Sequence, residues 1–496
     1  MEILYRSTRS DAAPITASQA ILKGLANDGG LYVPTALPTL DVSLQELARM
    51  DYRALAYEVM KLFLTDYTEE ELRACIAAAY DEKFDTPEIA PLHAANGAWY
   101  LELFHGATIA FKDMALSILP HLLTTAARKN NEDKDIVILT ATSGDTGKAA
   151  LAGFADVPGT KIIVFYPKDG VSSIQERQMV TQKGANTCVI GIRGNFDDAQ
   201  TGVKKIFTDP AEKEKLAAAG FQFSSANSIN IGRLVPQIAY YVWAYTRLLR
   251  ESAIEAGQEI NFSVPTGNFG NILAGYYARA IGVPIRRLVC ASNSNKVLYD
   301  FFKTGVYDRN REFILTSSPS MDILISSNLE RLIYHIAGDS AADNAAMMAE
   351  LSSNGRYEIT PEMRKELDVF VGGWAGEQET SDEIMERFVN DGYVLDPHTG
   401  VASSVYGQYR WETGDNTPAV IVSTASPFKF ETAVMKALGH PHDLPDLELA
   451  DELSKLSGIP VPQAVAGLRG AEVMHHTVCE GNVDAMRAEV ERFLGI

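Results

Sequence analysis

The fold is decided by the stretch Ile136-Val137-Ile138-Leu139-Thr140-Ala141-Thr142-Ser143-Gly144-Asp145-Thr146-Gly147-Lys148. It begins with a nearly continuous apolar run, continues through a loop of small and hydroxyl-bearing residues, and reaches a helical pattern at about Lys148. An apolar run bounded by turn residues is typical of a strand buried on both faces of a parallel sheet. The stretch therefore predicts one strand-loop-helix unit of an α/β fold.

The same alternation recurs along the chain. Further β-rich runs, each followed by a helical stretch, occupy residues 162–165, 187–190, 260–264, 287–290 and 419–422. A long helical pattern at 231–250 divides these runs into two groups. We therefore expect an α/β protein with two open, twisted, mostly parallel sheets flanked by helices, and a cleft between two lobes.

The flanking segments predict the domain organisation. Residues 1–95 show apolar residues at helical spacing, which predicts a mainly helical N-terminal domain with one or two short strands. The α/β pattern predicts a first, smaller lobe at 96–225 and a second, larger lobe at 226–440. Residues 441–496 are again helical and acidic, and we expect them to pack on the larger lobe.

Composition excludes several function classes. The 496-residue chain carries 44 Lys and Arg against 64 Asp and Glu, a net charge of -20. This charge argues against binding nucleic acid or an anionic membrane, because both require a basic surface. The four cysteines are widely spaced, so we expect neither a structural metal nor a disulfide framework. Without a membrane-length apolar run or a leader-like N-terminal segment, the expected location is the cytoplasm.

Lys112 is the candidate nucleophile. It lies in His105-Gly106-Ala107-Thr108-Ile109-Ala110-Phe111-Lys112-Asp113, where apolar residues enclose a single amine just ahead of a helical pattern. Burial disfavours the ammonium ion, so the pKa of this amine should fall and its nucleophilicity at neutral pH should rise. Such an amine can form a Schiff base. The alternative from the local sequence is a surface lysine whose stem lies over the helix start.

Two loops that follow strands predict anion sites, because ligands of open parallel sheets bind at the carboxyl ends of strands. The loop at 140–148 offers hydroxyls and backbone N–H groups at a helix start. It departs from a nucleotide-binding P-loop, because Thr142 stands where glycine is required and Ala149 follows the lysine, so the sequence gives ATP binding only weak support. The loop at 265–271, with two glycines, predicts a phosphate cradle. An ordinary turn rich in Gly and Asn is the alternative for either loop.

A third loop, at 422–430, follows the last predicted strand. There the neutral hydroxyl of Thr424 could hydrogen-bond a ring nitrogen while leaving that nitrogen unprotonated. Ser426 is better explained as a helix N-cap. His105 and His398 stand in suggestive surroundings, although each is more often a structural residue than a catalyst. No serine has both a nucleophile-elbow setting and a histidine partner, so serine hydrolase chemistry is unsupported.

Taken in order, these motifs resemble those of the threonine synthases, which are pyridoxal-phosphate enzymes of fold type II, the tryptophan-synthase-β fold group. The resemblance extends over the full length of the chain. It rests on Tyr5-Arg6-Ser7-Thr8-Arg9, Asp28-Gly29-Gly30-Leu31-Tyr32-Val33-Pro34, the lysine segment, Ser143-Gly144-Asp145-Thr146-Gly147, Gly267-Asn268-Phe269-Gly270-Asn271, Pro319-Ser320-Met321-Asp322-Ile323, Asp396-Pro397-His398-Thr399-Gly400 and Ser423-Thr424-Ala425-Ser426-Pro427.

The resemblance implies pyridoxal 5'-phosphate as the cofactor, with Lys112 forming the Schiff base. It implies that Thr424 faces the pyridine nitrogen and that the cofactor phosphate lies on Gly267, Asn268, Phe269, Gly270 and Asn271. The loop that receives the substrate carboxylate in this fold group corresponds to Ser143, Asp145 and Thr146. The implied activity is that of a carbon-oxygen lyase acting on phosphate, which converts O-phospho-L-homoserine and water to L-threonine and phosphate, the last step of threonine biosynthesis.

Two rival functions stay open. Another enzyme of the same fold, such as a serine or threonine dehydratase, shares the lysine and the loops, but the acidic N-terminal unit and the 28–34 motif favour threonine synthase. A non-catalytic protein that binds a phosphorylated metabolite would leave the apolar setting of Lys112 unexplained. We expect a monomer or a homodimer without a metal. Arg193, Lys183 and Arg233 are candidates for holding the substrate phosphate.

Overall fold

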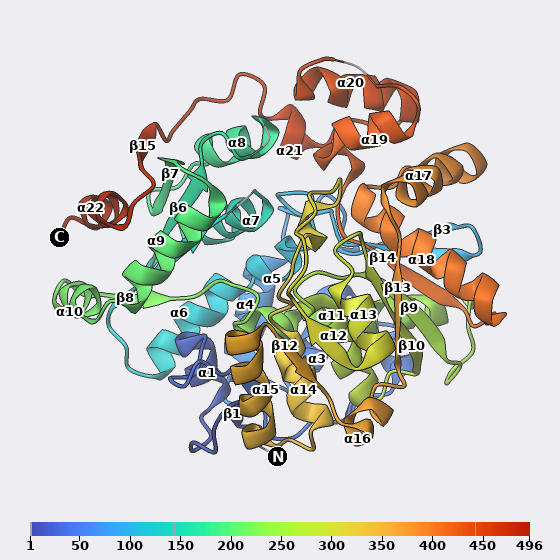
Figure 1. The fold of residues 1–496 in the computed structure, drawn as a ribbon, viewed down its shortest axis with the longest axis horizontal. Coiled ribbons are helices and arrows are strands. Elements are labelled where there is room, and N and C mark those ends of the chain that lie inside the picture. Colours follow the sequence, from blue (N-terminus) through green and yellow to red (C-terminus); the bar gives the residue numbers. More distant parts are fainter. Residues whose placement is uncertain (1, 143, 172, 442) are drawn as a thin grey trace.

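Two sheets organise the computed structural model, which describes residues 2–142, 144–171, 173–441 and 443–496 (Figure 1). The larger sheet has the order β13 (Phe370–Trp374), β10 (Ile285–Ser292), β9 (Ile260–Pro265), β14 (Ala419–Ser423), β4 (Ala98–Glu102) and β3 (Leu92–Ala95). The smaller has the order β15 (Thr477–Glu480), β7 (Thr187–Arg193), β6 (Thr160–Pro167), β5 (Asp135–Ala141) and β8 (Phe221–Ser224). Within these two sheets, all neighbouring strands pair in parallel except β3 with β4. The predicted α/β class with two mostly parallel sheets is confirmed.

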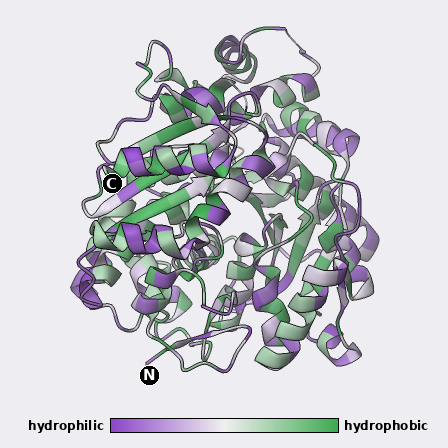
Figure 2. Cartoon of the chain, turned by 60° about the vertical axis from the view of Figure 1, so that its left-hand side comes forward, coloured by the Kyte–Doolittle hydropathy of each residue, from purple (hydrophilic) through white to green (hydrophobic). Residues whose placement is uncertain are grey.

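The smaller sheet is buried on both faces, as the sequence pattern predicts. Ile136, Val137, Ile138 and Leu139 of β5 are each at most 4% exposed. Figure 2 shows the corresponding pattern of hydropathy, in which the strands are mainly hydrophobic and the helices around them are mixed. The helices of this lobe are α7 (Asp145–Phe154), α8 (Ser173–Val180), α9 (Phe196–Thr208) and α10 (Pro210–Ala218).

The larger sheet is covered by long helices. α12 (Gly270–Ala280) packs against β9 and β10, and α18 (Pro397–Thr413) packs against β9, β10 and β14. The predicted helix at 231–250 is α11 (Ile231–Arg250), which packs on α12 and is almost entirely buried. Its first turn is capped by Asn230, whose side chain accepts a hydrogen bond from the Gly232 backbone.

The N-terminal region is mainly helical, with one short antiparallel pair, β1 (Tyr5–Ser7) and β2 (Tyr32–Pro34). Each of its four helices begins at a residue whose side chain accepts a hydrogen bond from the first turn, namely Thr16, Ser43, Asp51 and Thr68. These helices are α1 (Ala17–Lys23), α2 (Leu44–Leu47), α3 (Tyr52–Met60) and α4 (Glu69–Ala79). α3 packs against α11, which joins this region to the larger lobe.

Two packing expectations are corrected. β4, expected to open the smaller lobe at 96–225, instead pairs with β14 in the larger sheet. Residues 441–496, expected to pack on the larger lobe, do so only in part. Leu449, Ala450 and Leu453 belong to the core cluster that contains Ile421 of β14, whereas β15 joins the smaller sheet beside β7 and α22 (Val483–Leu494) packs on α9 (Figure 1). Both corrections come from strand pairs between residues hundreds of positions apart, which local sequence patterns do not encode.

The remaining elements connect or cover the lobes. They are α5 (Asp113–Leu116), α6 (Leu119–Lys129), α13 (Val297–Thr304), β11 (Val306–Asp308), η1 (Pro319–Met321), α14 (Leu329–Ile336), α15 (Ala341–Asn354), β12 (Arg356–Glu358), α16 (Pro361–Lys365), α17 (Glu377–Asp391), η2 (Pro427–Lys429), α19 (Glu431–Ala437), α20 (Asp446–Ser457) and α21 (Gln463–Ala466). Within the described ranges, no helix combines the length and the apolar character needed to cross a bilayer.

Candidate active site

The lysine segment is fixed against the loop that follows β14. The Phe111 N–H donates to the Thr424 carbonyl at 2.8 Å, and the Ser426 N–H donates to the Ile109 carbonyl at 3.1 Å. Ile109 has a φ of 51°, a conformation that strains a β-branched residue by about 1–3 kcal/mol. The pairing with the β14 loop holds this strained turn and directs Lys112 inward.

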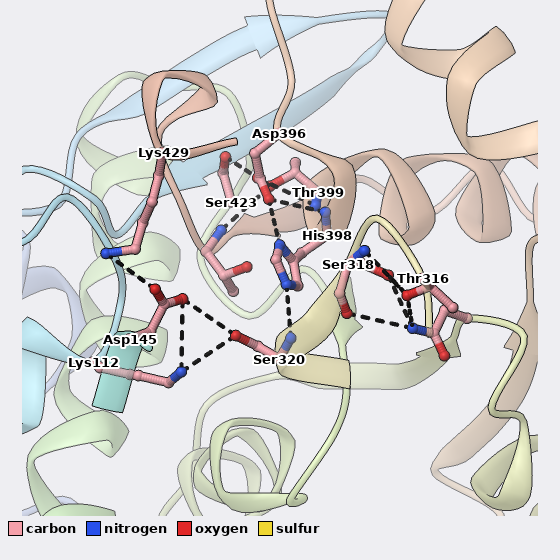
Figure 3. Close-up of polar contacts among 12 residues, drawn as sticks. Lys112, Asp145, Thr316, Ser318, Ser320, Asp396, His398, Thr399, Ser423 and Lys429 are labelled. Atoms are coloured by element: carbon pink, nitrogen blue, oxygen red, sulfur yellow. Dashed lines mark hydrogen bonds and ion pairs between the residues drawn. The ribbon is translucent and has the colours of Figure 1, made fainter. Parts of the chain in front are cut away.

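The Lys112 amine is held in a largely buried, polar surrounding. Its side chain is 13% exposed, and Nζ lies 3.2 Å from Ser320 Oγ and 3.9 Å from Asp145 Oδ2 (Figure 3). Burial lowers the pKa of Lys112 from 10.5 to about 8, against the opposing attraction of Asp145, and the positive charges of Lys429 and Arg233 add to the lowering. A larger share of this amine is therefore neutral at physiological pH than in an ordinary lysine, as the sequence predicts.

Asp145, at the first turn of α7, has a lysine against each of its two oxygens. Oδ1 lies 3.3 Å from the buried Lys429 Nζ, which also donates to the Thr108 carbonyl at 2.8 Å. Burial opposes ionisation of Asp145, but Lys429 and Lys112 keep the pKa of this carboxyl well below its ordinary value. Asp145 is therefore an anion that balances two buried amines.

The rest of the 140–148 loop folds back on Thr142. Its Oγ1 accepts hydrogen bonds from the Gly144 and Gly147 backbones, both at 3.0 Å. Thr146 is half-buried on α7, while the predicted substrate-binding residue Ser143 lies outside the described residues. α7 thus begins at Asp145, whose carboxylate oxygen Oδ2 lies 3.9 Å from Lys112 Nζ.

The 265–271 loop joins β9 to α12, as predicted. Phe269 adopts a φ of 65° directly before the helix, and its ring packs against Phe302 and Phe370 in the core. Gly270 starts the helix, and Asn268 is exposed. The turn therefore offers backbone N–H groups at a helix N-terminus, while the Phe269 side chain serves packing.

The same loop contains an excess of hydrogen-bond donors. Asn271 Oδ1 accepts from the hydroxyls of Tyr240 and Tyr241, both at 2.7 Å, which directs its amide nitrogen elsewhere. Among the described residues, that Nδ2 and the Nδ2 of Asn328 are buried and have no partner. Asn328 borders Gly270. Unpaired buried donors beside a helix start are suited to an anion.

The lysine and this loop meet through η1. A Cβ added to Gly267 would lie 2.5 Å from the Ser320 carbonyl oxygen, so only glycine allows η1 to approach the loop this closely. Ser320 is also the residue that receives the hydrogen bond from Lys112. The structure therefore brings the predicted nucleophile and the predicted phosphate cradle to one site.

Thr424 completes the set of predicted site residues. It is buried at the end of β14, and its N–H donates to Thr399 Oγ1 at 3.3 Å. Thr399 in turn donates to Asp396, the N-cap of α18. Thr424 thus follows directly after β14, the strand that lies between β9 and β4 in the larger sheet.

Comparison with known proteins agrees with this geometry. Residues 84–426 match the family described as pyridoxal-phosphate dependent enzyme, residues 4–80 match threonine synthase N terminus, and residues 399–478 match threonine synthase, C-terminal. The threonine synthase of Schizosaccharomyces pombe is 36% identical over 89% of this chain and 90% of its own length. The chain belongs to the threonine synthase family. Members of this family are pyridoxal-phosphate-dependent enzymes.

Two further relatives place the chain within that family. The solved structure of PLP-bound threonine synthase from Brucella melitensis covers all of both chains, with a TM-score of 0.86 and 33% sequence identity. Threonine synthase-like 1 of Macaca fascicularis is 36% identical over 96% of this chain, and the chain spans 66% of that longer protein.

The site residues fit the cofactor of this family. Its phosphate requires a cradle of donors, which the α12 start and the unpaired amide nitrogens of Asn271 and Asn328 provide. Its aldehyde requires a neutral amine, which Lys112 provides. Ser320 links the groups that meet these two requirements, because its hydroxyl contacts Lys112 and its carbonyl packs against Gly267 of the phosphate loop.

Three residues of the site were not predicted as functional. Ser320 contacts Lys112, His398 accepts the Ser320 N–H at 3.1 Å, and Lys429 is paired with Asp145. Two of them stand in motifs that carry the family resemblance, at 319–323 and 396–400. Those motifs were the available signal, but no local pattern indicates that distant loops converge on one amine.

Proposed function

We propose that the chain converts O-phospho-L-homoserine and water to L-threonine and inorganic phosphate, using pyridoxal phosphate held covalently by Lys112 as a Schiff base. The position of Lys112 carries this proposal, because its amine is largely buried, has a pKa lowered to about 8, and touches the residue that packs on the 265–271 loop. Relatives named threonine synthase, matched over nearly their whole length, support this choice of substrate.

The proposed roles divide between binding and proton transfer. The cofactor, when bound, supplies an electron sink for the substrate carbon that loses a proton. The neutral Lys112 amine takes that proton and returns protons later, which suits a group with a pKa of about 8. Gly267, Asn268, Phe269, Gly270 and Asn271 hold the cofactor phosphate, chiefly through backbone N–H groups and the Asn271 amide. The Thr424 hydroxyl faces the ring nitrogen.

We assign the substrate carboxylate to the backbone N–H groups of the loop containing Ser143, Asp145 and Thr146. The carboxylate of Asp145 is an unsuitable direct partner, because it is itself an anion engaged by Lys429. Its proposed role is to hold Lys112 and Lys429 in place. The helix start of α7 favours a negative group at the same position.

For the substrate phosphate we favour Arg233. It is 4% exposed at the start of α11, its Nε has no partner among the described residues, and its charge acts on Lys112. Arg193 is exposed and paired with Glu480 at 2.7 Å, and Lys183 is exposed. Neither of these two is suited to a buried phosphate site.

The deciding experiment is an assay of phosphate release and threonine formation from phosphohomoserine, with serine and threonine offered as competing substrates. We expect equal amounts of phosphate and threonine. A protein that forms a 2-oxo acid from serine or threonine faster than it forms threonine from phosphohomoserine would be a dehydratase. Binding of phosphohomoserine without any product would identify the metabolite-binding alternative. The cytoplasmic location and the monomeric or dimeric state stay predictions.

A further inference from the structure

Ser320 occupies a position between the two ionisable groups closest to the reacting amine. Its Oγ lies 3.2 Å from Lys112 Nζ and 3.4 Å from Asp145 Oδ2, while Nζ and Oδ2 are 3.9 Å apart (Figure 3). A hydroxyl both donates and accepts, so it can accept from the Lys112 ammonium or donate to the neutral amine. Ser320 can therefore hold Nζ in place in either protonation state.

The backbone of Ser320 is fixed by His398. The Ser320 N–H donates to His398 Nε2 at 3.1 Å, so that nitrogen carries no hydrogen. The hydrogen must then lie on Nδ1, which is 2.8 Å from Asp396 Oδ1. Both His398 and Asp396 are buried. The carboxylate thus selects the tautomer that can accept the Ser320 N–H.

Asp396 links Ser320 to a second predicted cofactor contact. Its Oδ2 accepts from the Thr399 hydroxyl, and Thr399 Oγ1 accepts the Thr424 N–H at 3.3 Å. One buried carboxylate therefore orients η1 through His398 and the end of β14 through Thr399. The lysine segment is connected to the same hydrogen-bond network, because the Phe111 N–H donates to the Thr424 carbonyl.

We propose that Ser320 is a further catalytic residue, whose hydroxyl holds the Lys112 nitrogen in position, and that His398 and Asp396 are positioning residues that fix Ser320. The inference rests on the proposed role of Lys112 and adds the group that orients its amine. The charged groups that face Lys112 are Asp145 from α7, Lys429 from η2, Arg233 from α11 and Asp113 from α5, with His398 beyond Ser320.

The test measures the Lys112 amine in the apoenzyme, without substrate. Acetylation of Lys112 would be followed from about pH 6 to about pH 10 by peptide mass spectrometry, because only the neutral amine reacts. A hydrogen bond to the ammonium is stronger than one to the neutral amine, so losing the hydroxyl in Ser320→Ala should lower the Lys112 pKa by about one further unit. In the holoenzyme we expect kcat to fall at least about tenfold with little change in KM.

Four variants separate orientation from general damage. Ser320→Thr keeps the hydroxyl and should restore the titration, and Ser317→Ala removes a hydroxyl of the same loop that makes none of these contacts. His398→Phe should lower the pKa of Lys112 less than Ser320→Ala does, and His398→Gln, which can still accept the Ser320 N–H, should recover part of that shift.

The possible outcomes are distinct. A titration of Lys112 that is unchanged in folded Ser320→Ala, or that moves equally in Ser317→Ala, overturns the proposal. Failure of the proposed function would appear separately, as a wild-type holoenzyme that forms no threonine while the apoenzyme titration still responds to Ser320.

Discussion

Lys429 Nζ lies 3.3 Å from Oδ1 of Asp145, so the carboxylate that faces the reactive lysine is already neutralised from its other side. Both side chains are buried, and a buried ion pair is expensive to break from one side because the remaining charge is left uncompensated. Burial lowers the pKa of Lys112, and Lys429 limits how far the anion beside Lys112 opposes that lowering. The second amine offsets the anion.

Asp145→Asn should therefore lower both the stability of the protein and the pKa of Lys112. At neutral pH we expect the free energy of unfolding to fall by about 3 kcal/mol and the pKa of Lys112 to fall further below 8. The folded pKa of Asp145 is depressed, so its contribution is present above the ordinary value of 3.8 and is lost as the pH falls below it. In urea titrations the deficit of the variant should thus shrink in acid. Asp415→Asn, at a half-buried carboxylate that accepts hydrogen bonds from Asn261 and Tyr409, should lose stability without changing the pKa of Lys112.

Lys112→Ala should abolish turnover and prevent borohydride from trapping pyridoxal phosphate on the chain, while the circular dichroism spectrum stays native. Lys148 is the matched control, because burial also lowers its pKa to about 8 but its Nζ donates to Gln182 instead. Lys148→Ala should still trap the cofactor at Lys112, located by peptide mapping. Near-normal phosphate release by Lys112→Ala would refute its assigned role. A wild-type protein that stays colourless with added pyridoxal phosphate would refute the whole assignment.

Lys112→Met should stabilise the apoenzyme at neutral pH. A lysine with a pKa of about 8 when folded and 10.5 ordinarily binds fewer protons in the folded state between these values, so stability rises with pH through this window. At pH 7 the buried amine lowers the free energy of unfolding by about 3 kcal/mol. We expect the variant to gain about that amount in urea titrations at pH 7, and the gain to shrink between about pH 8 and pH 10.5. Exposed Lys183→Met should gain nothing, and a destabilised Lys112→Met would contradict the buried amine.

The local features of the site could be predicted from the sequence because each is encoded over a few residues. The β5 run, the glycine-rich turn at 265–271 and the apolar surroundings of Lys112 all follow from short patterns of side-chain type. The long helix α11 was predicted with its observed limits, since its hydrophobic pattern extends without a break. Pro236 does not interrupt it.

What the sequence could not predict depends on contacts between distant segments. Ser320 lies 208 positions from Lys112, and β15 pairs with a strand nearly 300 positions earlier. No periodicity or turn signal encodes such a pairing, because several registers and neighbours satisfy the same local pattern. His398 was interpreted as structural because the sequence around it does not show that η1 lies beside it. Only the approach of η1 turns its Nε2 into the acceptor that positions Ser320.

Thr424→Asp should change the electronic state of the cofactor. A carboxylate in place of the neutral hydroxyl favours protonation of a facing ring nitrogen, which strengthens the electron sink and favours side reactions such as transamination. We expect a shifted absorbance maximum and a higher ratio of 2-oxo acid to threonine. Asparagine has nearly the same shape as aspartate but no charge, so Thr424→Asn should show neither change. If colour, cofactor affinity and products are unchanged in Thr424→Asp, Thr424 is not the partner of the ring nitrogen.

Gly267→Ala should separate the two halves of the site without touching a functional side chain. Its Cβ would lie 2.5 Å from the Ser320 carbonyl oxygen and 3.4 Å from the Met321 Cα, and backbone at that distance has to move. Displacement of η1 should withdraw the Ser320 hydroxyl from Lys112, so we expect cofactor affinity and kcat each to fall at least about tenfold. Equilibrium dialysis of pyridoxal phosphate and the threonine assay measure the two effects.

The matched control for this prediction is Gly407→Ala on α18, where an added Cβ meets no atom within 4 Å. Because alanine is the better helix former by about 1 kcal/mol, this variant should be slightly more stable and fully active. If Gly267→Ala keeps wild-type affinity and turnover, η1 can shift without consequence, and the contact between Ser320 and Lys112 is not what couples the lysine to the phosphate loop.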